Sequence, residues 1–387
     1  MLFKSLLVSV LCAMGLQASA QDLVPLPTQP EGLAWPTESW PEGELPEETR
    51  DDLQLLVQEA MNRDQGQEMG KTRAIVIIHE GRLVYEAYAE NFGPDTKQVS
   101  WSMAKSITSA LVGRVVMLGL IEDIDTPMPS PFAADDPRRE ITWRQWLTMT
   151  DGLDYLEIGS TGLMDNDVVQ MMYGPGRFDV AQHIVDEFEL AHDPGAVWNY
   201  STAGFHLIAR ALQEVTGAED EAGFARTMDE MLFEPIGMEA VPEFDAAGTF
   251  LGGSLVWASA RDFAKFGYLY LRGGVWQGER LLPEGWVDFS RRDPASTKAN
   301  VYGAGWWLGA DPDPVPEGQA ATTPPFDAFS AQGHEGQTIW VVPSKDLVIV
   351  RLGIMPNGGN NWPALYEWNQ SIARLFPDAE PGVSSAP

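Results

Sequence analysis

The sequence predicts an α+β fold in which helices flank one antiparallel sheet built from both ends of the chain. Two observations predict it. Short β-branched runs that can pair across tight turns lie near both ends of the 387 residues, and the middle carries apolar residues at helical spacing. This length exceeds a typical domain of roughly 100–200 residues, so we expect a large core, or two lobes that share a cleft.

The first twenty residues have the pattern of a secretory signal peptide. Lys4 precedes an apolar stretch, residues 6–16, that is too short to span a bilayer, and Ala18-Ser19-Ala20 is a small-residue cleavage site. We expect cleavage near Ala20 and export to the periplasm or the exterior. The only cysteine, Cys12, lies in this segment, so the mature chain has no disulfide and no thiolate nucleophile.

The next segments predict an arm, a helix and a hairpin. Residues 21–46 are rich in proline and are expected to form an extended arm, held on the surface by Trp35 and Trp40. Residues 47–61 have helical spacing. Two short strands, 74–78 and 83–85, follow around a Glu-Gly turn.

The C-terminal part mirrors this pattern. Residues 338–342 and 347–350 read as strands joined by a turn, and a final helix is expected from Pro363 to about Phe376. Residues 377–387 look like a disordered tail. No later stretch could cross a membrane, because Arg114 interrupts the most apolar one.

The middle of the chain predicts helices with long irregular connections. Helices are expected at 141–150 and 204–215, with Gly217 able to cap the second. Residues 151–200 carry many Gly, Pro and Asp residues and are expected to wall a cleft. We therefore expect a sheet lobe from 47–118 and 245–376, and a mainly helical lobe from 119–244.

The charge balance excludes one class of function. The chain has 25 basic and 56 acidic residues, a formal charge of −31. Such a surface repels phosphate backbones and anionic lipid, so nucleic-acid binding is not expected. Solubility explains the charge by itself.

The strongest local motif is Ser102-Met103-Ala104-Lys105. If a helix begins at Ser102, residues at i and i+3 are neighbours on one face, and an ammonium beside a hydroxyl can activate a serine nucleophile. The unsatisfied N–H groups of the helix start also favour an oxyanion. Taken alone, the motif is a weak signal, because a helix-capping serine and a solvated lysine explain most of its occurrences.

Two further segments carry groups that could complete a site. Tyr200 lies between a turn at 194–195 and the helix that follows; its phenol is a base only if a cation such as Lys105 stabilises the anion. The segment 333–337, Gly-His-Glu-Gly-Gln, enters a strand, where a backbone N–H can face a carbonyl oxygen. A half-buried tyrosine and a surface His334 in a turn are the structural alternatives.

In this order, the three motifs resemble the serine β-lactamase and penicillin-binding-protein superfamily. The similarity is to the class C-like branch, which includes esterases and 6-aminohexanoate-dimer hydrolases. Three intervening stretches also resemble that branch: residues 141–153, 258–267 and 302–307. The likeness spans roughly residues 50–375.

The resemblance implies a β-lactamase/transpeptidase-like fold and a set of roles. Ser102 would be the acylated nucleophile, Lys105 would accept or shuttle its proton, and Tyr200 would be a phenolate partner that delivers a proton to the leaving group. The backbone N–H groups of Ser102 and Gln337 would form the oxyanion hole. Water would then hydrolyse the acyl-enzyme.

Departures from the family pattern narrow the substrate. Thr202 replaces an asparagine that contacts the acylamino group of β-lactams, and His334 replaces a lysine that helps hold their carboxylate. Both favour an exported esterase or amidase acting on a small, less anionic ester or amide. The expected substrate contacts are Thr202, His334, Gly336, Tyr173 and Asp179.

Other readings stay open or are excluded. A β-lactamase, a D-alanyl-D-alanine carboxypeptidase-like enzyme and a penicillin-recognising binding protein without turnover are the alternatives. The sequence has no G-x-S-x-G pentapeptide, and neither His-Glu pair continues to a second histidine, so we expect no α/β-hydrolase triad, no metal and no cofactor. The sequence indicates no particular protein partner.

Overall fold

The computed structural model describes residues 23–379, except 63–68, 159–161, 295–300, 310–326 and 356–361. The predicted signal peptide therefore lies outside the described residues, as do residues 380–387 of the predicted tail. Described residues 377–379 are tied to the sheet, because the Ala379 N–H donates to the Ser344 carbonyl at 2.7 Å and Asp378 pairs with Lys345 at 2.6 Å.

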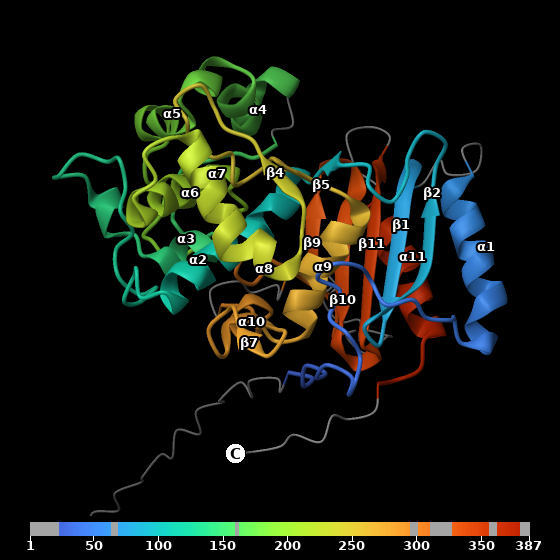
Figure 1. Cartoon of the computed structure of the whole chain (residues 1–387). Helices are drawn as coiled ribbons and strands as arrows, with labels where there is room; N and C mark the ends of the chain where they lie inside the picture. Colours follow the sequence, from blue (N-terminus) through green and yellow to red (C-terminus); the bar gives the residue numbers. More distant parts are fainter. Residues whose placement is uncertain are drawn as a thin grey trace, which may run out of the picture.

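A six-stranded antiparallel sheet has the strand order β2-β1-β11-β10-β9-β8. N-terminal strand β1 pairs with C-terminal strand β11, with Ile77 opposite Ile349, so the two chain ends do form one sheet as predicted (Figure 1). The strands are β1 (Lys71–His79), β2 (Arg82–Tyr88), β8 (Trp307–Leu308), β9 (Phe329–Gly333), β10 (Gln337–Val342) and β11 (Leu347–Ile354).

Both faces of this sheet are covered by helices, which explains why its strands are almost continuously apolar. Ile75 and Ile77 of β1 join one core with α1 (Arg50–Met61) and α11 (Trp362–Leu375). Their neighbours Val76 and Ile78 join the other core, which α9 (Ala260–Leu271) and α2 (Ala104–Met117) share (Figure 1). The alternation along β1 thus assigns each face its own core.

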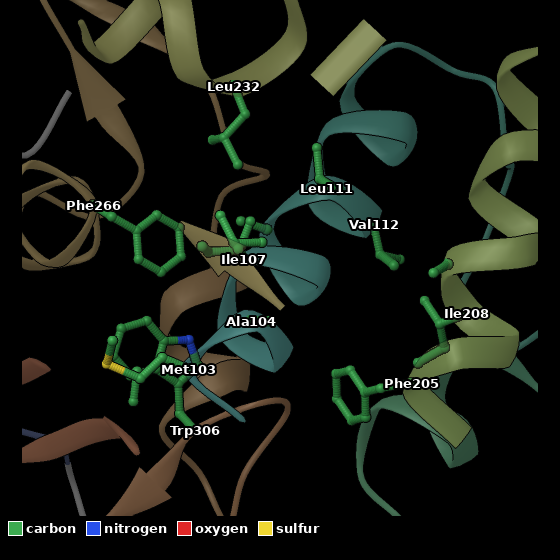
Figure 2. Close-up of a cluster of buried hydrophobic side chains, with 14 of the residues drawn as sticks. Met103, Ala104, Ile107, Leu111, Val112, Phe205, Ile208, Leu232, Phe266 and Trp306 are labelled. Atoms are coloured by element: carbon green, nitrogen blue, oxygen red, sulfur yellow. The ribbon is translucent and has the colours of Figure 1, made fainter. Parts of the chain in front are cut away.

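Helix α2 lies at the centre of the larger core. Eleven of its fourteen residues are buried, including Lys105. Figure 2 shows Phe266 of α9 and Trp306 on one side of α2, and Phe205 and Ile208 of α6 on the other. The helix therefore joins the sheet layer to the helical part of the molecule.

The helical part departs from the sequence prediction in two places. The helix expected at 141–150 is only α3 (Trp143–Leu147), since Thr142 and Gln145 cap its start reciprocally and Met149 has a positive φ of 55°. The segment 151–200 contains two helices that the breakers concealed, α4 (Asp167–Met172) and α5 (Val180–Glu187). The helix predicted at 204–215 is confirmed as α6 (Thr202–Thr216), ended by Gly217 in the left-handed region.

Smaller elements complete the described chain. Strands β3 (Gln98–Val99), β5 (Val256–Ala258) and β4 (Ala240–Pro242) form a second sheet beside the start of α2. The other α-helices and strands are α7 (Glu221–Met228), α8 (Glu234–Ile236), β6 (Val275–Trp276), β7 (Glu279–Arg280) and α10 (Trp286–Ser290). Among the helices so described, none combines the length and the apolar character needed to span a bilayer.

Candidate active site

Ser102 lies in a single 3-10 turn, Trp101–Met103, that leads directly into α2. The preceding Trp101 has a positive φ of 46°, a conformation that costs a non-glycine residue energy and that clusters at functional sites. Ser100 fixes this turn to β5, because its Oγ accepts from the Val256 N–H at 3.0 Å. Ser102 is partly exposed while Met103 and Ala104 are buried, so its hydroxyl stands at the edge of the core.

Lys105 reaches back from α2 to Ser102, as the i,i+3 spacing predicts. Its Nζ donates to Ser102 Oγ at 2.9 Å, to Thr202 Oγ1 at 2.8 Å and to the Gly253 carbonyl at 2.7 Å. Burial lowers the pKa of Lys105 to about 8, against an opposing effect of the Glu157 carboxylate. An amine with this pKa is partly neutral near pH 7, so it can act as a base.

Tyr200 lies beside Lys105, with 4.9 Å between Lys105 Nζ and the centroid of the tyrosine ring. Its ring stacks on Trp307 at 5.2 Å and meets Tyr302 edge-on at 6.0 Å. Burial raises the pKa of Tyr200, and Glu157 raises it further, although hydrogen bonding with the Ser102 side chain lowers it. The phenol form is therefore favoured in the free protein, not the phenolate that the resemblance implies.

Glu157 is a neighbour of these groups that sequence reasoning missed. It lies in the connection between α3 and α4, and its two carboxylate oxygens accept from the backbone N–H and the hydroxyl of Thr202, at 3.0 and 2.7 Å. Thr202 is fully buried, and its hydroxyl is occupied by Glu157 and Lys105. Its expected contact with the substrate stays a prediction.

The turn before β10 lies beside Ser102. His334 is exposed and packs edge-on against Trp101, with ring centroids 5.3 Å apart. Glu335 and Gly336 both have positive φ, 61° and 80°, and a Cβ at position 336 would lie 2.8 Å from Arg351 Nη1. Glycine is thus required there on both grounds.

Two side chains hold this turn from behind. Arg351 Nη1 donates to the carbonyls of Glu335 and Gly336 at 3.1 and 3.0 Å, while the Gln337 amide exchanges two hydrogen bonds with the Gly353 backbone, at 2.7 and 2.9 Å. In a trans peptide the N–H points opposite to the preceding carbonyl. The Gln337 N–H therefore points away from Arg351, and its side chain serves the sheet and not a substrate.

Tyr173 and Asp179 are not brought into the same hydrogen-bond network. Tyr173 is 58% exposed at the end of α4. Asp179 caps α5, its Oδ1 accepting from the Gln182 N–H at 2.9 Å. Their role as substrate contacts stays a prediction. Within the part of the chain that the structure describes, no group of three or more His, Cys, Asp or Glu side chains could hold a metal ion.

Comparisons with known proteins show what the chain resembles in sequence and in fold. Residues 57–353 match the family described as Beta-lactamase. The 6-aminohexanoate-dimer hydrolase of Paenarthrobacter ureafaciens is 24% identical over 308 residues, which cover 74% of this chain and 73% of that protein.

Solved structures show the same fold. A Bacillus anthracis protein provisionally named as a 6-aminohexanoate-dimer hydrolase has a TM-score of 0.68 at 20% identity, covering 92% of this chain and 91% of its own. A penicillin-binding-protein homolog from Caulobacter crescentus has a TM-score of 0.62 at 15% identity, covering 86% and 99%. The predicted β-lactamase/transpeptidase-like fold is confirmed.

Proposed function

The chain belongs to the beta-lactamase family of hydrolases and is related to 6-aminohexanoate-dimer hydrolase; from this premise we propose that it is an exported serine hydrolase that cleaves a small ester or amide through an acyl-enzyme. One observation carries the proposal: Lys105 Nζ lies 2.9 Å from the partly exposed Ser102 hydroxyl, while the Lys105 side chain is itself buried. Export rests on the sequence pattern of residues 1–20 alone.

Acylation begins with the neutral amine of Lys105. It takes the Ser102 hydroxyl proton as Oγ forms a bond to the substrate carbonyl carbon, and the carbonyl π electrons move to oxygen. The N–H groups of Ser102 and Gln337 then hold this oxyanion, each worth roughly 3–4 kcal/mol in the transition state.

Collapse of the tetrahedral intermediate needs a proton for the leaving group. The bond from carbon to the leaving oxygen or nitrogen breaks as Tyr200 donates its phenol proton, and the Lys105 ammonium returns a proton to Tyr200. Because the pKa of Tyr200 is raised, its phenol is held as a donor until this step. Water repeats the sequence in reverse, giving its proton to Lys105 and releasing Ser102.

The substrate preference follows from what surrounds Ser102. The hydroxyl of Thr202 is committed to Glu157 and Lys105, so it is not available to an acylamino group. His334 and Glu335 stand where the family often has a fixed cation, which leaves a β-lactam carboxylate without its partner. Similarity to the Paenarthrobacter enzyme adds short linear amides of amino acids to the esters that we expect to be cleaved.

Hydrolysis of p-nitrophenyl butyrate tests the proposal. We expect steady release of p-nitrophenol by the wild type, because deacylation completes each cycle. A single stoichiometric burst would support an acylating binding protein instead, and no release from any ester or amide in a panel would contradict the proposal. Nitrocefin is expected to be hydrolysed weakly or not at all; rapid turnover would favour the β-lactamase alternative.

Ser102→Ala isolates the nucleophile. We expect it to abolish ester turnover while circular dichroism and the melting temperature stay close to those of the wild type, since Ser102 is at the edge of the core. Ser106→Ala, one turn further along the buried helix α2, is the matched control and should keep its activity. Turnover by a folded Ser102→Ala variant would remove Ser102 from the mechanism.

A further inference from the structure

Glu157 holds Thr202 by two groups at once. One carboxylate oxygen accepts from the Thr202 backbone N–H at 3.0 Å and the other from its hydroxyl at 2.7 Å. The first bond satisfies an N–H at the start of α6, where Ser201 already caps the helix through the Gly204 N–H. The second bond does nothing for the helix, so it calls for a different explanation.

The second bond fixes the direction of the Thr202 hydroxyl. An ionised carboxylate can only accept, so the hydroxyl proton points to Glu157 and the Thr202 oxygen is left as an acceptor. Lys105 Nζ donates to that oxygen at 2.8 Å, and the Gly253 carbonyl, which can also only accept, lies at 2.7 Å. Two of the three hydrogen-bonding directions around Nζ therefore face acceptors, and each of the two must carry an N–H bond.

The third direction is occupied by Ser102 Oγ at 2.9 Å. A neutral amine has two N–H bonds and one lone pair, so satisfying both acceptors leaves the lone pair facing the serine hydroxyl. We propose that Glu157 is a positioning residue that, through Thr202, directs the lone pair of Lys105 at Ser102. This inference rests on the proposed serine-hydrolase function and names a residue that makes the base productive.

Losing the carboxylate would remove this constraint. In Glu157→Gln the amide oxygen can still accept from the Thr202 N–H, but the amide nitrogen can only donate to the Thr202 oxygen. The hydroxyl proton then turns towards Lys105 and competes with Ser102 for the lone pair. The shape of the site is kept, while the direction of the hydroxyl proton changes.

The negative charge of Glu157 also affects the pKa of Lys105. The ionisable groups that interact with it or with Lys105 are Tyr155, Tyr200, His206 and Tyr302, and Asp167 lies next to Tyr155. Of these, His206 is neutral near pH 7, because burial lowers its pKa to about 3. Glu157 raises the pKa of Lys105, so removing its charge lowers that pKa and exposes the neutral amine at lower pH.

The experiment measures kcat/KM for p-nitrophenyl butyrate against pH in the full-length protein. For Glu157→Gln we expect the plateau at high pH to fall by about tenfold or more, and the acidic limb, governed by Lys105, to move to lower pH. Glu157→Asp keeps the charge, so the acidic limb of its pH profile should lie closer to that of the wild type. Thr202→Ser keeps the hydroxyl and should retain more of the plateau than Thr202→Val, which should lose about as much as Glu157→Gln.

Asp220→Ala is the control for a purely structural role. Asp220 caps α7 by accepting from the Gly223 N–H, away from Ser102, so removing this acceptor should lower the melting temperature without changing the pH profile. The rate of Ser102 labelling by a fluorophosphonate gives a second readout. There the Oγ–P bond forms, the P–F bond breaks, and Lys105 takes the hydroxyl proton.

The outcomes separate this inference from the proposed function. If Ser102→Ala is as active or as strongly labelled as the wild type, the serine-hydrolase proposal fails first. If labelling and turnover need Ser102 but Glu157→Gln keeps the wild-type plateau and acidic limb, the positioning role alone is overturned. A misfolded Glu157→Gln variant leaves Thr202→Val to decide: a wild-type plateau there overturns the inference equally.

Discussion

Tyr200 illustrates how a single side chain changes its chemistry with its surroundings. The ammonium of Lys105 lies over its ring and the Ser102 hydroxyl bonds to it, both of which stabilise an anion. Burial and the carboxylate of Glu157 oppose this, and the net pKa is raised. We therefore expect Tyr200 to give a proton during catalysis before it ever accepts one.

Tyr200→Phe tests this role. The variant keeps the stacking on Trp307 and loses only the hydroxyl, so we expect kcat to fall by about 10²–10⁴ with a small change in KM. Tyr270→Phe, which removes a buried hydroxyl from α9, is the control and should keep the wild-type kcat. A Tyr200→Phe enzyme with nearly normal kcat would show that leaving groups take their proton from elsewhere.

Asp151 predicts a pH dependence of stability. It is buried, one oxygen accepts from the Leu153 N–H at 3.0 Å, and burial raises its pKa from 3.8 to about 6. The folded chain therefore holds this proton more tightly than the unfolded chain, and the free energy of unfolding falls as pH rises from about 4 through 6.

Asp151→Asn should remove that dependence. Urea denaturation is expected to show a gain of about 1–3 kcal/mol near pH 8 and none near pH 4. The exposed neighbour variant Asp154→Asn serves as control and should show no such pH-dependent gain. An equal effect of Asp151→Asn at both pH values would mean that packing, and not ionisation, governs this position.

Sequence patterns could find Ser102 and Lys105, because an i,i+3 pair on one helix is a local property. Tyr200 could be proposed from the sequence because it lies between a predicted turn and the start of a predicted helix. Glu157 was not, because it lies 45 residues from Thr202 in a connection without periodicity, and only the tertiary fold brings them together. Asp179 caps helix α5, a role that the sequence analysis did not assign to it, and its contact with a substrate stays a prediction.

At the scale of elements, the turn before β10 depends on Arg351. This buried guanidinium serves the carbonyls of Glu335, Gly336 and Met69 and the hydroxyl of Thr72. These hydrogen bonds satisfy carbonyl groups that the irregular turn cannot pair with a neighbouring strand. The position of the Gln337 N–H is therefore set from the interior of the sheet.

Arg351→Met should loosen this turn. Leaving buried carbonyls without a donor costs about 1–3 kcal/mol each, so we expect a loss of at least about 3 kcal/mol in unfolding free energy, together with a lower kcat. Arg351→Lys keeps one donor group and should lose less of both. Unchanged urea denaturation of Arg351→Met would show that water replaces the guanidinium.

The elements themselves were predicted unevenly. Strands at both chain ends and helix α6 carry strong periodicity and clear end signals, and they were found. Helices α4 and α5 were not predicted because glycine, proline and aspartate surround their short apolar runs. The aspartate cap that starts α5 is also a common turn residue, so it does not by itself indicate a helix. Their formation depends on packing against α6, which no local pattern contains.

The whole molecule carries a formal charge of −31, and this predicts a response to salt. Repulsion among like charges destabilises the compact state, and screening shortens its range to about 10 Å at 0.1 M ionic strength. We expect the melting temperature to rise from about 10 mM to about 0.5 M NaCl. KCl at equal ionic strength should act alike, and a flat or falling melting temperature in both salts would contradict the charge argument.

Helix α2 has a consequence for how activity can be lost. Its buried surface is shared between the sheet and the helical half. The proposed nucleophile Ser102 lies in the 3-10 turn that leads into this helix, and the proposed base Lys105 lies in its first turn. Local fraying at the periphery, which opens most proteins long before they denature, cannot reach this anchor. Catalysis should accordingly survive in rising denaturant until the entire cooperative unit melts, and inactivation should report global collapse of the native state.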